Sequence, residues 1–327
     1  MNKWSALFLL GVVVLCNGRE PFRPREGSMP FVVYFLSRYR GLCVGALVSR
    51  TAVITAAVCV TNPLTVTKDT RHINVIAGTT YRHLRRGIRV PVTKIIIPKW
   101  TNATSNQGYL MQKSPAVMLL KHQVPDVIAE VPLRGINIAY QGEIKLTLHE
   151  ECLIPGYHFF YKGDKITQDK FLLQRNMRVQ FMNVAKKYLY CDTLEIKFQQ
   201  GLIHLGFEGH TDKTTYICIH DPDRTAQPCH GMYGAPLICQ GKVIAMLMAP
   251  DAQWTNCTGF SNIVHLFSTH FLRDYMDCVS SLFSPEFYLE GDALKRYIYD
   301  DKEEEYDYLP EMYDTIVSES TSTEEVH

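Results

Sequence analysis

The stretch that decides the fold is Cys229-His-Gly-Met-Tyr-Gly-Ala-Pro-Leu-Ile-Cys239. Two cysteines enclose a turn that contains Gly231 and Gly234, and Pro236 opens an apolar, strand-like run. Glycine tolerates the positive φ values of tight turns and leaves backbone N–H groups accessible. A turn of this composition is typical of a loop that directs N–H donors at a developing oxyanion.

Three other stretches are also apolar, and two of them contain a cysteine. Gly41–Val48 reads Gly-Leu-Cys-Val-Gly-Ala-Leu-Val, Ala52–Cys59 reads Ala-Val-Ile-Thr-Ala-Ala-Val-Cys, and Ala116–Lys121 reads Ala-Val-Met-Leu-Leu-Lys. Together with Cys229–Cys239 they resemble the chymotrypsin/trypsin family. The corresponding family motifs are Cys-x-Gly-x-Leu-Ile … Leu-Thr-Ala-Ala-His-Cys, Asp-Ile-Ala-Leu-Leu-Lys and Cys-x-Gly-Asp-Ser-Gly-Gly-Pro-Leu-x-Cys.

Short apolar runs without helical periodicity independently predict an all-β barrel or sandwich. They are Pro30–Leu36, Gly41–Val48, Ala52–Cys59, Ile73–Ala77, Ile88–Val92, Ile95–Ile97, Val117–Leu120, Leu172–Phe181 and Gly241–Met248. The resemblance spans roughly residues 29–283 within one domain, 19–283. It implies two six-stranded antiparallel Greek-key barrels, in lobes of about 29–150 and 151–265, and a helix over 267–283.

The resemblance also implies that the catalytic residues are missing. Val58 stands where the family has its catalytic His, Ala116 where it has the triad Asp, and Tyr233 where it has the nucleophilic Ser. Isopropyl and methyl groups transfer no proton, and a phenol with a pKa of about 10 needs a base. We therefore predict a non-catalytic serine protease homologue. The alternative is an endopeptidase with a displaced site rebuilt from His122, His204, His220 or His230.

Activation and substrate binding are also expected to fail. No Ile-Val-Gly-Gly-like cleavage site precedes Pro30, and Met232 replaces the Asp that pairs with the freed amino terminus in the family. Gln227 occupies the specificity position. Pro250, which has no N–H group, lies where the family pairs a strand with substrate backbone.

The whole-chain composition excludes several other classes. With 327 residues, 46% of them hydrophobic, the chain can bury a sizeable core. Residues 1–18 are typical of a secretory signal peptide, with Lys3 ahead of the apolar run Ala6–Leu15. The net charge of +1 argues against nucleic acid, and no later run is long enough to span a membrane. We expect a secreted, extracellular protein without a cofactor or metal.

Ten cysteines in a secreted chain predict a disulfide framework. The resemblance implies the pairs Cys43–Cys59, Cys152–Cys239, Cys191–Cys218 and Cys229–Cys257. Cys278 is left over once Cys16 leaves with the signal peptide. It shares a helical stripe with Phe271, Tyr275 and Leu282. We therefore expect an unpaired, buried thiol, and a disulfide to a second chain is the alternative.

Residues 284–327 differ in composition from the rest of the chain. From Asp300 onward there are eleven acidic residues and one Lys, and because the whole chain is +1, the preceding residues carry +11. This is the composition of a disordered, solvated acidic tail. Partner binding and intramolecular screening of the basic body are the alternatives. Candidate sulfotyrosines are Tyr299, Tyr306, Tyr308 and Tyr313, and the N-glycosylation sequons contain Asn102 and Asn256.

These observations predict protein binding rather than catalysis. The expected partners are extracellular proteins, such as active serine proteases or other protease homologues, and the expected role is cofactor, scaffold or decoy in a proteolytic network. Insect homologues of this type occur in haemolymph cascades and in seminal fluid, and the lack of a Cys-rich amino-terminal clip module favours a reproductive secretion. A disulfide-linked structural or carrier protein is the alternative from another class.

Overall fold

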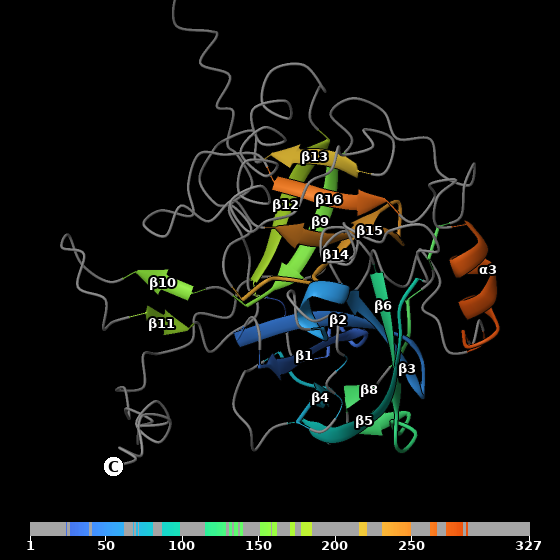
Figure 1. The fold of residues 1–327 in the computed structure, drawn as a ribbon. Helices are drawn as coiled ribbons and strands as arrows, with labels where there is room; N and C mark the ends of the chain where they lie inside the picture. The colour runs from blue at the N-terminus through green and yellow to red at the C-terminus, as the bar shows by residue number, and fades with distance from the viewer. Residues whose placement is uncertain are drawn as a thin grey trace, which may run out of the picture.

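The structure is a computed structural model, drawn as a ribbon in Figure 1. It describes residues 24, 27–38, 41–61, 68, 70, 72–80, 87–98, 115–128, 131–132, 134–136, 138–139, 151–157, 159–161, 171–173, 178–184, 216–220, 231–249, 262–266, 273–283 and 286. None of the helices within these ranges has the length and apolar character needed to cross a bilayer.

Six antiparallel strands close the N-terminal barrel in the order β1-β2-β3-β6-β5-β4. They are β1 (Val32–Ser37), β2 (Gly41–Ser49), β3 (Ala52–Ala56), β4 (Asn74–Ala77), β5 (Ile88–Ile96) and β6 (Pro115–Leu120). Strands β2 and β3 are rich in small and β-branched residues and bury nearly every side chain. Strand β5 instead exposes several of its residues, so its outer face meets solvent.

Six further strands close a second barrel in the order β12-β13-β16-β15-β14-β9. They are β9 (Glu151–Gly156), β12 (Arg178–Val184), β13 (Tyr216–His220), β14 (Pro236–Cys239), β15 (Lys242–Ala249) and β16 (Asn262–Leu266). When the strands of each barrel are counted along the chain, both rings have the same order of neighbours. Two short hairpins add β7 (Val127–Ile128) with β8 (Val131–Pro132), and β10 (Phe159–Tyr161) with β11 (Phe171–Leu173). The all-β prediction is confirmed.

Four of the predicted runs have different boundaries in the structure. Residues 88–92 and 95–96 belong to one strand, β5, whose pairing with β6 shifts register between Val92 and Lys94, and residue 97 follows its end. Such a bulge bends a strand without ending it. Residues 52–59 leave strand β3 at Ala56 and continue as the 3₁₀-helix η1 (Ala57–Cys59). Residues 172–181 are divided between β11 and β12.

The C-terminal helix α3 spans Arg273–Ser280, and residues 281–283 leave the helix, so it ends earlier than predicted. Met276 and Val279 are buried, whereas Cys278 is exposed. The prediction of a buried thiol is therefore wrong. With 3.6 residues per turn, the buried face is centred near Val279, and Cys278 falls at the edge of that face.

The two barrels contact each other through buried groups. The Tyr157 hydroxyl, next to β9, donates a hydrogen bond to the carbonyl oxygen of Thr79 near β4 (3.1 Å). The Tyr157 ring also meets the Tyr34 ring of β1 edge to face, with centroids 4.9 Å apart. The segment joining the barrels is fixed to the second one, since the Ala139 N–H donates to the Val243 carbonyl (2.9 Å).

Candidate functional site

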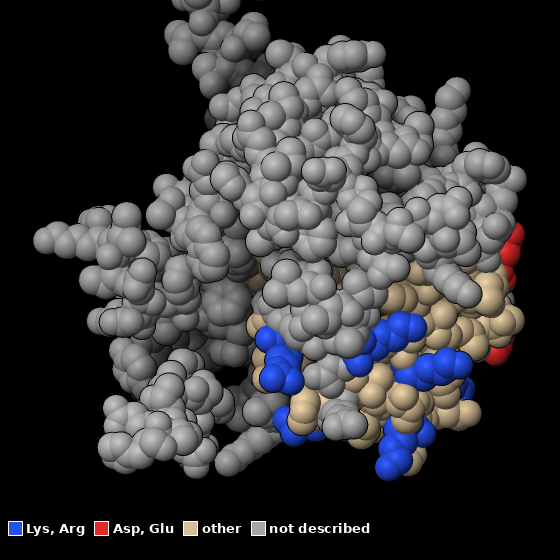
Figure 2. Space-filling view, in the orientation of Figure 1, with Lys and Arg blue, Asp and Glu red and all other residues tan. Residues whose placement is uncertain are grey.

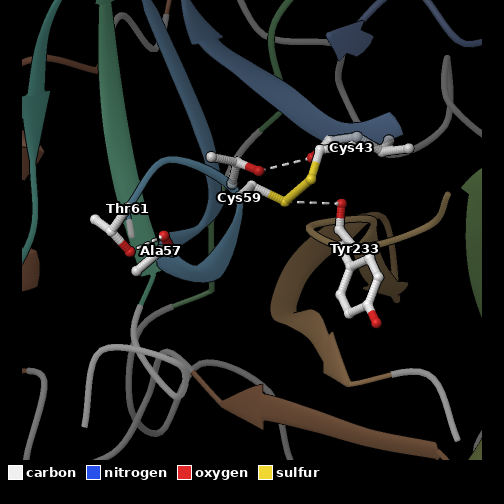
Figure 3. Close-up of a disulfide and its surroundings, with 7 residues drawn as sticks. Cys43, Ala57, Cys59, Thr61 and Tyr233 are labelled. Atoms are coloured by element: carbon white, nitrogen blue, oxygen red, sulfur yellow. Dashed lines mark hydrogen bonds between the residues drawn. A yellow bond between two sulfur atoms is a disulfide. The ribbon is translucent and has the colours of Figure 1, made fainter. Parts of the chain in front are cut away.

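Tyr233 lies where the two barrels meet, and its main chain is fixed there. Its carbonyl oxygen accepts a hydrogen bond from the Val44 N–H of β2 (2.8 Å), and Tyr233 forms a parallel bridge with Cys43. The Sγ of Cys59, which has no hydrogen to donate within its disulfide, lies 3.6 Å from the same oxygen. Figure 3 shows the phenol ring extending away from this disulfide. The backbone therefore holds the loop, while the half-buried side chain points elsewhere.

Gly234 allows the loop to approach the N-terminal barrel closely. Its φ is +77°, a conformation that favours glycine. A Cβ at this position would collide with Thr55 Oγ1 and the Val44 carbonyl oxygen. On the other side, the Gly234 N–H donates to the Leu247 carbonyl of β15 (2.8 Å). The turn is thus held by both barrels.

Val58 and Ala116, the other two residues that the sequence predicts at triad positions, are buried in the same region. Val58 in η1 is 3% exposed, and Ala116 on β6 is fully buried. Ala116 lies opposite Thr55 of β3, whose hydroxyl donates to the Val44 carbonyl (2.7 Å). Because Val44 in turn bonds Tyr233, a continuous set of neighbours connects Ala116 to Tyr233. Of Val58, Ala116 and Tyr233, only Tyr233 carries a hydroxyl group. Neither Val58 nor Ala116 can act as a base toward it.

Met232 is fully buried and packs on Gly156 at the end of β9. A Cβ built on Gly156 would lie 2.7 Å from the Cε of Met232 and 3.0 Å from its Cγ. The glycine is therefore what makes room for the thioether side chain. At position 232 the flexible, apolar methionine side chain fills the space above Gly156. The sequence analysis did not predict this contact between Met232 and Gly156.

Two disulfides frame the site. Cys43–Cys59 ties η1 to β2, and Cys152–Cys239 ties β9 to its neighbour β14. Figure 3 shows the first disulfide beside η1, where the Thr61 hydroxyl donates to the Ala57 carbonyl (2.6 Å). The pairs Cys191–Cys218 and Cys229–Cys257 stay predictions, because Cys191, Cys229 and Cys257 lie outside the described residues.

Several other predicted positions also fall outside the described residues. They are Gln227, His204, His230, Pro250, both glycosylation sequons and the four tyrosines of the acidic segment. Among the histidines that are described, His122 is exposed after β6 and His220 ends β13. In the part of the chain that the structure describes, no group of three or more His, Cys, Asp or Glu side chains could hold a metal ion.

Comparisons with known proteins agree with this architecture. The sequence profile of the trypsin family matches residues 19–157, and no curated protein sequence matches the chain. The chain is similar to the scabies mite inactivated protease paralogue S-D1 (15% identity, TM-score 0.57) and to human heparin binding protein (15% identity, TM-score 0.54). Each of these alignments covers 81% of this chain and 98% of the other.

It is also similar to mouse neuropsin, a serine protease expressed in the limbic system of the brain (15% identity, TM-score 0.53), over 79% of this chain and 99% of that one. A serine protease and an inactivated paralogue thus share this architecture, so the fold alone does not distinguish catalysis from its loss. The chain has the trypsin-like fold, and its residues 19–157 match the sequence profile of the trypsin family.

Proposed function

We propose that this protein is a secreted, catalytically inactive serine protease homologue that binds other proteins of an extracellular proteolytic network as a cofactor, scaffold or decoy. The observation that carries the proposal is the set of side chains gathered where the barrels meet: Val58, Ala116 and Tyr233. A valine and an alanine, both buried, occupy the positions that would hold a base and its orienting acid.

The chemistry of these groups supports the loss of catalysis. A triad works as a unit, and the loss of one member removes most of the rate. A hydroxyl nucleophile needs a base within hydrogen-bond reach, and neither Val58 nor Ala116 can accept a proton. Only the phenol of Tyr233 is ionisable among the three, and it needs an accepting base at neutral pH. The replacements therefore remove the general base, the orienting acid and the usual nucleophile together.

The packing of Met232 supports a binding surface that exists without proteolytic activation. A buried Asp at this position would need a cation, whereas Met232 is satisfied by its apolar contact with Gly156. The loop is also held by the hydrogen bonds of Tyr233 and Gly234 to both barrels. We infer that a partner can recognise the uncleaved chain.

Tyr233 supplies an anchor for such a partner. It is half-buried, its carbonyl oxygen is held by the Val44 N–H, and its ring extends away from the disulfide (Figure 3). Tyrosine is enriched at protein interfaces because it combines a large apolar face with a polar tip. The scabies mite relative is an inactivated paralogue of the same fold, which supports the possibility of retaining the scaffold without the catalyst.

Two measurements test the proposal. Purified full-length protein is expected to react with neither a fluorophosphonate probe nor a peptide library, and labelling or turnover would instead establish a displaced active site. Crosslinking and pull-down from the native extracellular fluid should recover a protein partner. Tyr233→Ala should reduce its capture at least several-fold, whereas Leu36→Ala, at an exposed apolar residue of β1, should not. Equal capture by both variants would remove Tyr233 from the interface.

The proposal also states where the protein acts. The two disulfides support an oxidising, extracellular environment, and analogy with insect homologues favours a reproductive secretion such as seminal fluid. The exposed, unpaired Cys278 favours a second candidate, a disulfide-linked structural or carrier protein. Non-reducing electrophoresis of the secreted protein separates the two: a covalent dimer that disappears in Cys278→Ser would support the second candidate.

A further inference from the structure

Three exposed basic side chains lie on neighbouring strands of the N-terminal barrel and form no ion pair with a described residue. Arg89 and Lys94 lie on β5, Lys121 directly follows β6, and all three are exposed. None of them has an ion-pair partner among the described residues. We refer to Arg89, Lys94 and Lys121 as the basic strip.

Strand pairing brings the members of the basic strip together. The Lys121 N–H donates to the Pro91 carbonyl (2.8 Å), and Pro91 lies between Arg89 and Lys94 along β5. The register shift after Val92 leaves Lys94 exposed on a strand whose alternate residues are buried. At about 3.3 Å per residue, Arg89 and Lys94 are within roughly 17 Å of each other along the strand.

The described carboxylate of the N-terminal barrel, Asp126, is paired with arginines that are not part of the basic strip. Among the described residues between 27 and 139, Asp126 is the one carboxylate, and it pairs with Arg50 (2.5 Å) and lies 3.8 Å from Arg134. Figure 2 shows Lys and Arg side chains spread over the described part of the molecule and acidic side chains along its right-hand margin, on the side where Figure 1 places α3. Arg89, Lys94 and Lys121 therefore form no ion pair with a described carboxylate within 4.0 Å.

We propose that the acidic segment 300–327 of the same molecule docks on the basic strip. This segment carries a net charge of −10, and six of its acidic residues lie within positions 300–307. Charge of this density attracts Lys and Arg over a Debye length of about 8–10 Å at physiological salt. Sulfation of Tyr306 or Tyr308 would add acceptor oxygens to the same region and strengthen the contact.

The position of helix α3 supports docking within one molecule. The Tyr275 hydroxyl of α3 donates to the Ile96 carbonyl of β5 (3.1 Å), two residues along the strand from Lys94. The chain leading to the acidic segment therefore starts beside the strand that carries Arg89 and Lys94. Sixteen residues, 284–299, separate Phe283 from Asp300, and a random-coil chain of this length spans roughly 20–24 Å. A short tether of this kind gives an effective concentration on the order of millimolar, which favours the acidic segment over a second molecule.

Zero-length carbodiimide crosslinking of the full-length protein, followed by mass spectrometry, tests the contact. At low salt, Lys94 and Lys121 should become linked to carboxylates of residues 300–307 within monomers. These links should disappear at about 0.5 M salt, where screening shortens the Debye length to roughly 4 Å. Lys68→Gln, at an exposed lysine of the same barrel, should leave them unchanged. Links found only within crosslinked dimers would assign the strip to a second copy, and the absence of links would overturn the proposal.

Retention on immobilised heparin gives a second readout on full-length chains. Replacing the six acidic residues of 300–307 by their amides should expose the strip, so this variant should elute at higher salt than the natural protein. Adding Arg89→Gln, Lys94→Gln and Lys121→Gln should abolish that gain. Equal elution of the natural protein and the amide variant would contradict docking in cis if Arg89→Gln, Lys94→Gln and Lys121→Gln also weaken retention of the natural chain, because the strip would then bind heparin while the acidic segment is present.

Discussion

The hydroxyl of Tyr157 donates a hydrogen bond to the carbonyl oxygen of Thr79, at 3.1 Å, and so joins the two barrels through buried groups. Tyr157→Phe keeps the edge-to-face contact with Tyr34 but leaves the buried carbonyl without this donor. The net contribution of an intramolecular hydrogen bond to stability is about 0.5–1.5 kcal/mol. Urea unfolding should show a loss of this size. Leu36→Ala, at a side chain 58% exposed, should change stability by less than about 0.5 kcal/mol. Equal stabilities of the two variants would contradict the role given to this bond.

Gly234 and Gly41 separate the cost of backbone conformation from the cost of space. Both have positive φ, +77° and +70°, but a Cβ at Gly41 meets nothing within 4 Å, whereas at Gly234 it would strike Thr55 and Val44. Gly41→Ala should therefore cost only the left-handed penalty, about 1–2 kcal/mol. Gly234→Ala should cost clearly more and should displace the loop. The two free energies of unfolding are compared by denaturant titration, and similar values would mean that the loop relaxes freely.

The sequence predicted the barrel fold and the position of the loop well, for a physical reason. The features that predict the fold are local ones: the cysteine spacing, the glycines required at turns and the apolar runs of the strands. Each of them constrains the conformation of the residues in which it occurs. The partner of Met232 was not predictable in this way. Gly156 lies on β9, far away in sequence, and only the folded barrel brings the two together. Cys278 was misjudged for a related reason, because a short helix has several faces and only packing selects the one that is buried.

Met232 provides a test of whether the chain retains an activation device. Met232→Leu preserves an apolar side chain of similar volume and should cost less than about 1.5 kcal/mol. Met232→Asp places a carboxyl in the same buried position and should cost more than about 3 kcal/mol at neutral pH if no cation reaches it. Burial raises the pKa of such a carboxyl, so the loss should shrink as the pH falls toward about 4, the ordinary pKa of Asp. Equal stability of the two variants would reveal a cationic partner and reopen the question of activation.

Tyr275 should make the docking of α3 sensitive to alkaline pH. Burial raises the pKa of its hydroxyl above the usual value of 10.0, and the hydroxyl donates to the Ile96 carbonyl. The folded protein therefore keeps this proton at a pH where the unfolded chain has lost it. The stabilisation is complete below about pH 10 and falls as the pH rises further. Tyr275→Phe removes this group and should flatten that part of the stability profile relative to the natural protein, measured by urea unfolding between pH 8 and 11. Parallel profiles of the two proteins would mean that the phenol ionises without undocking the helix.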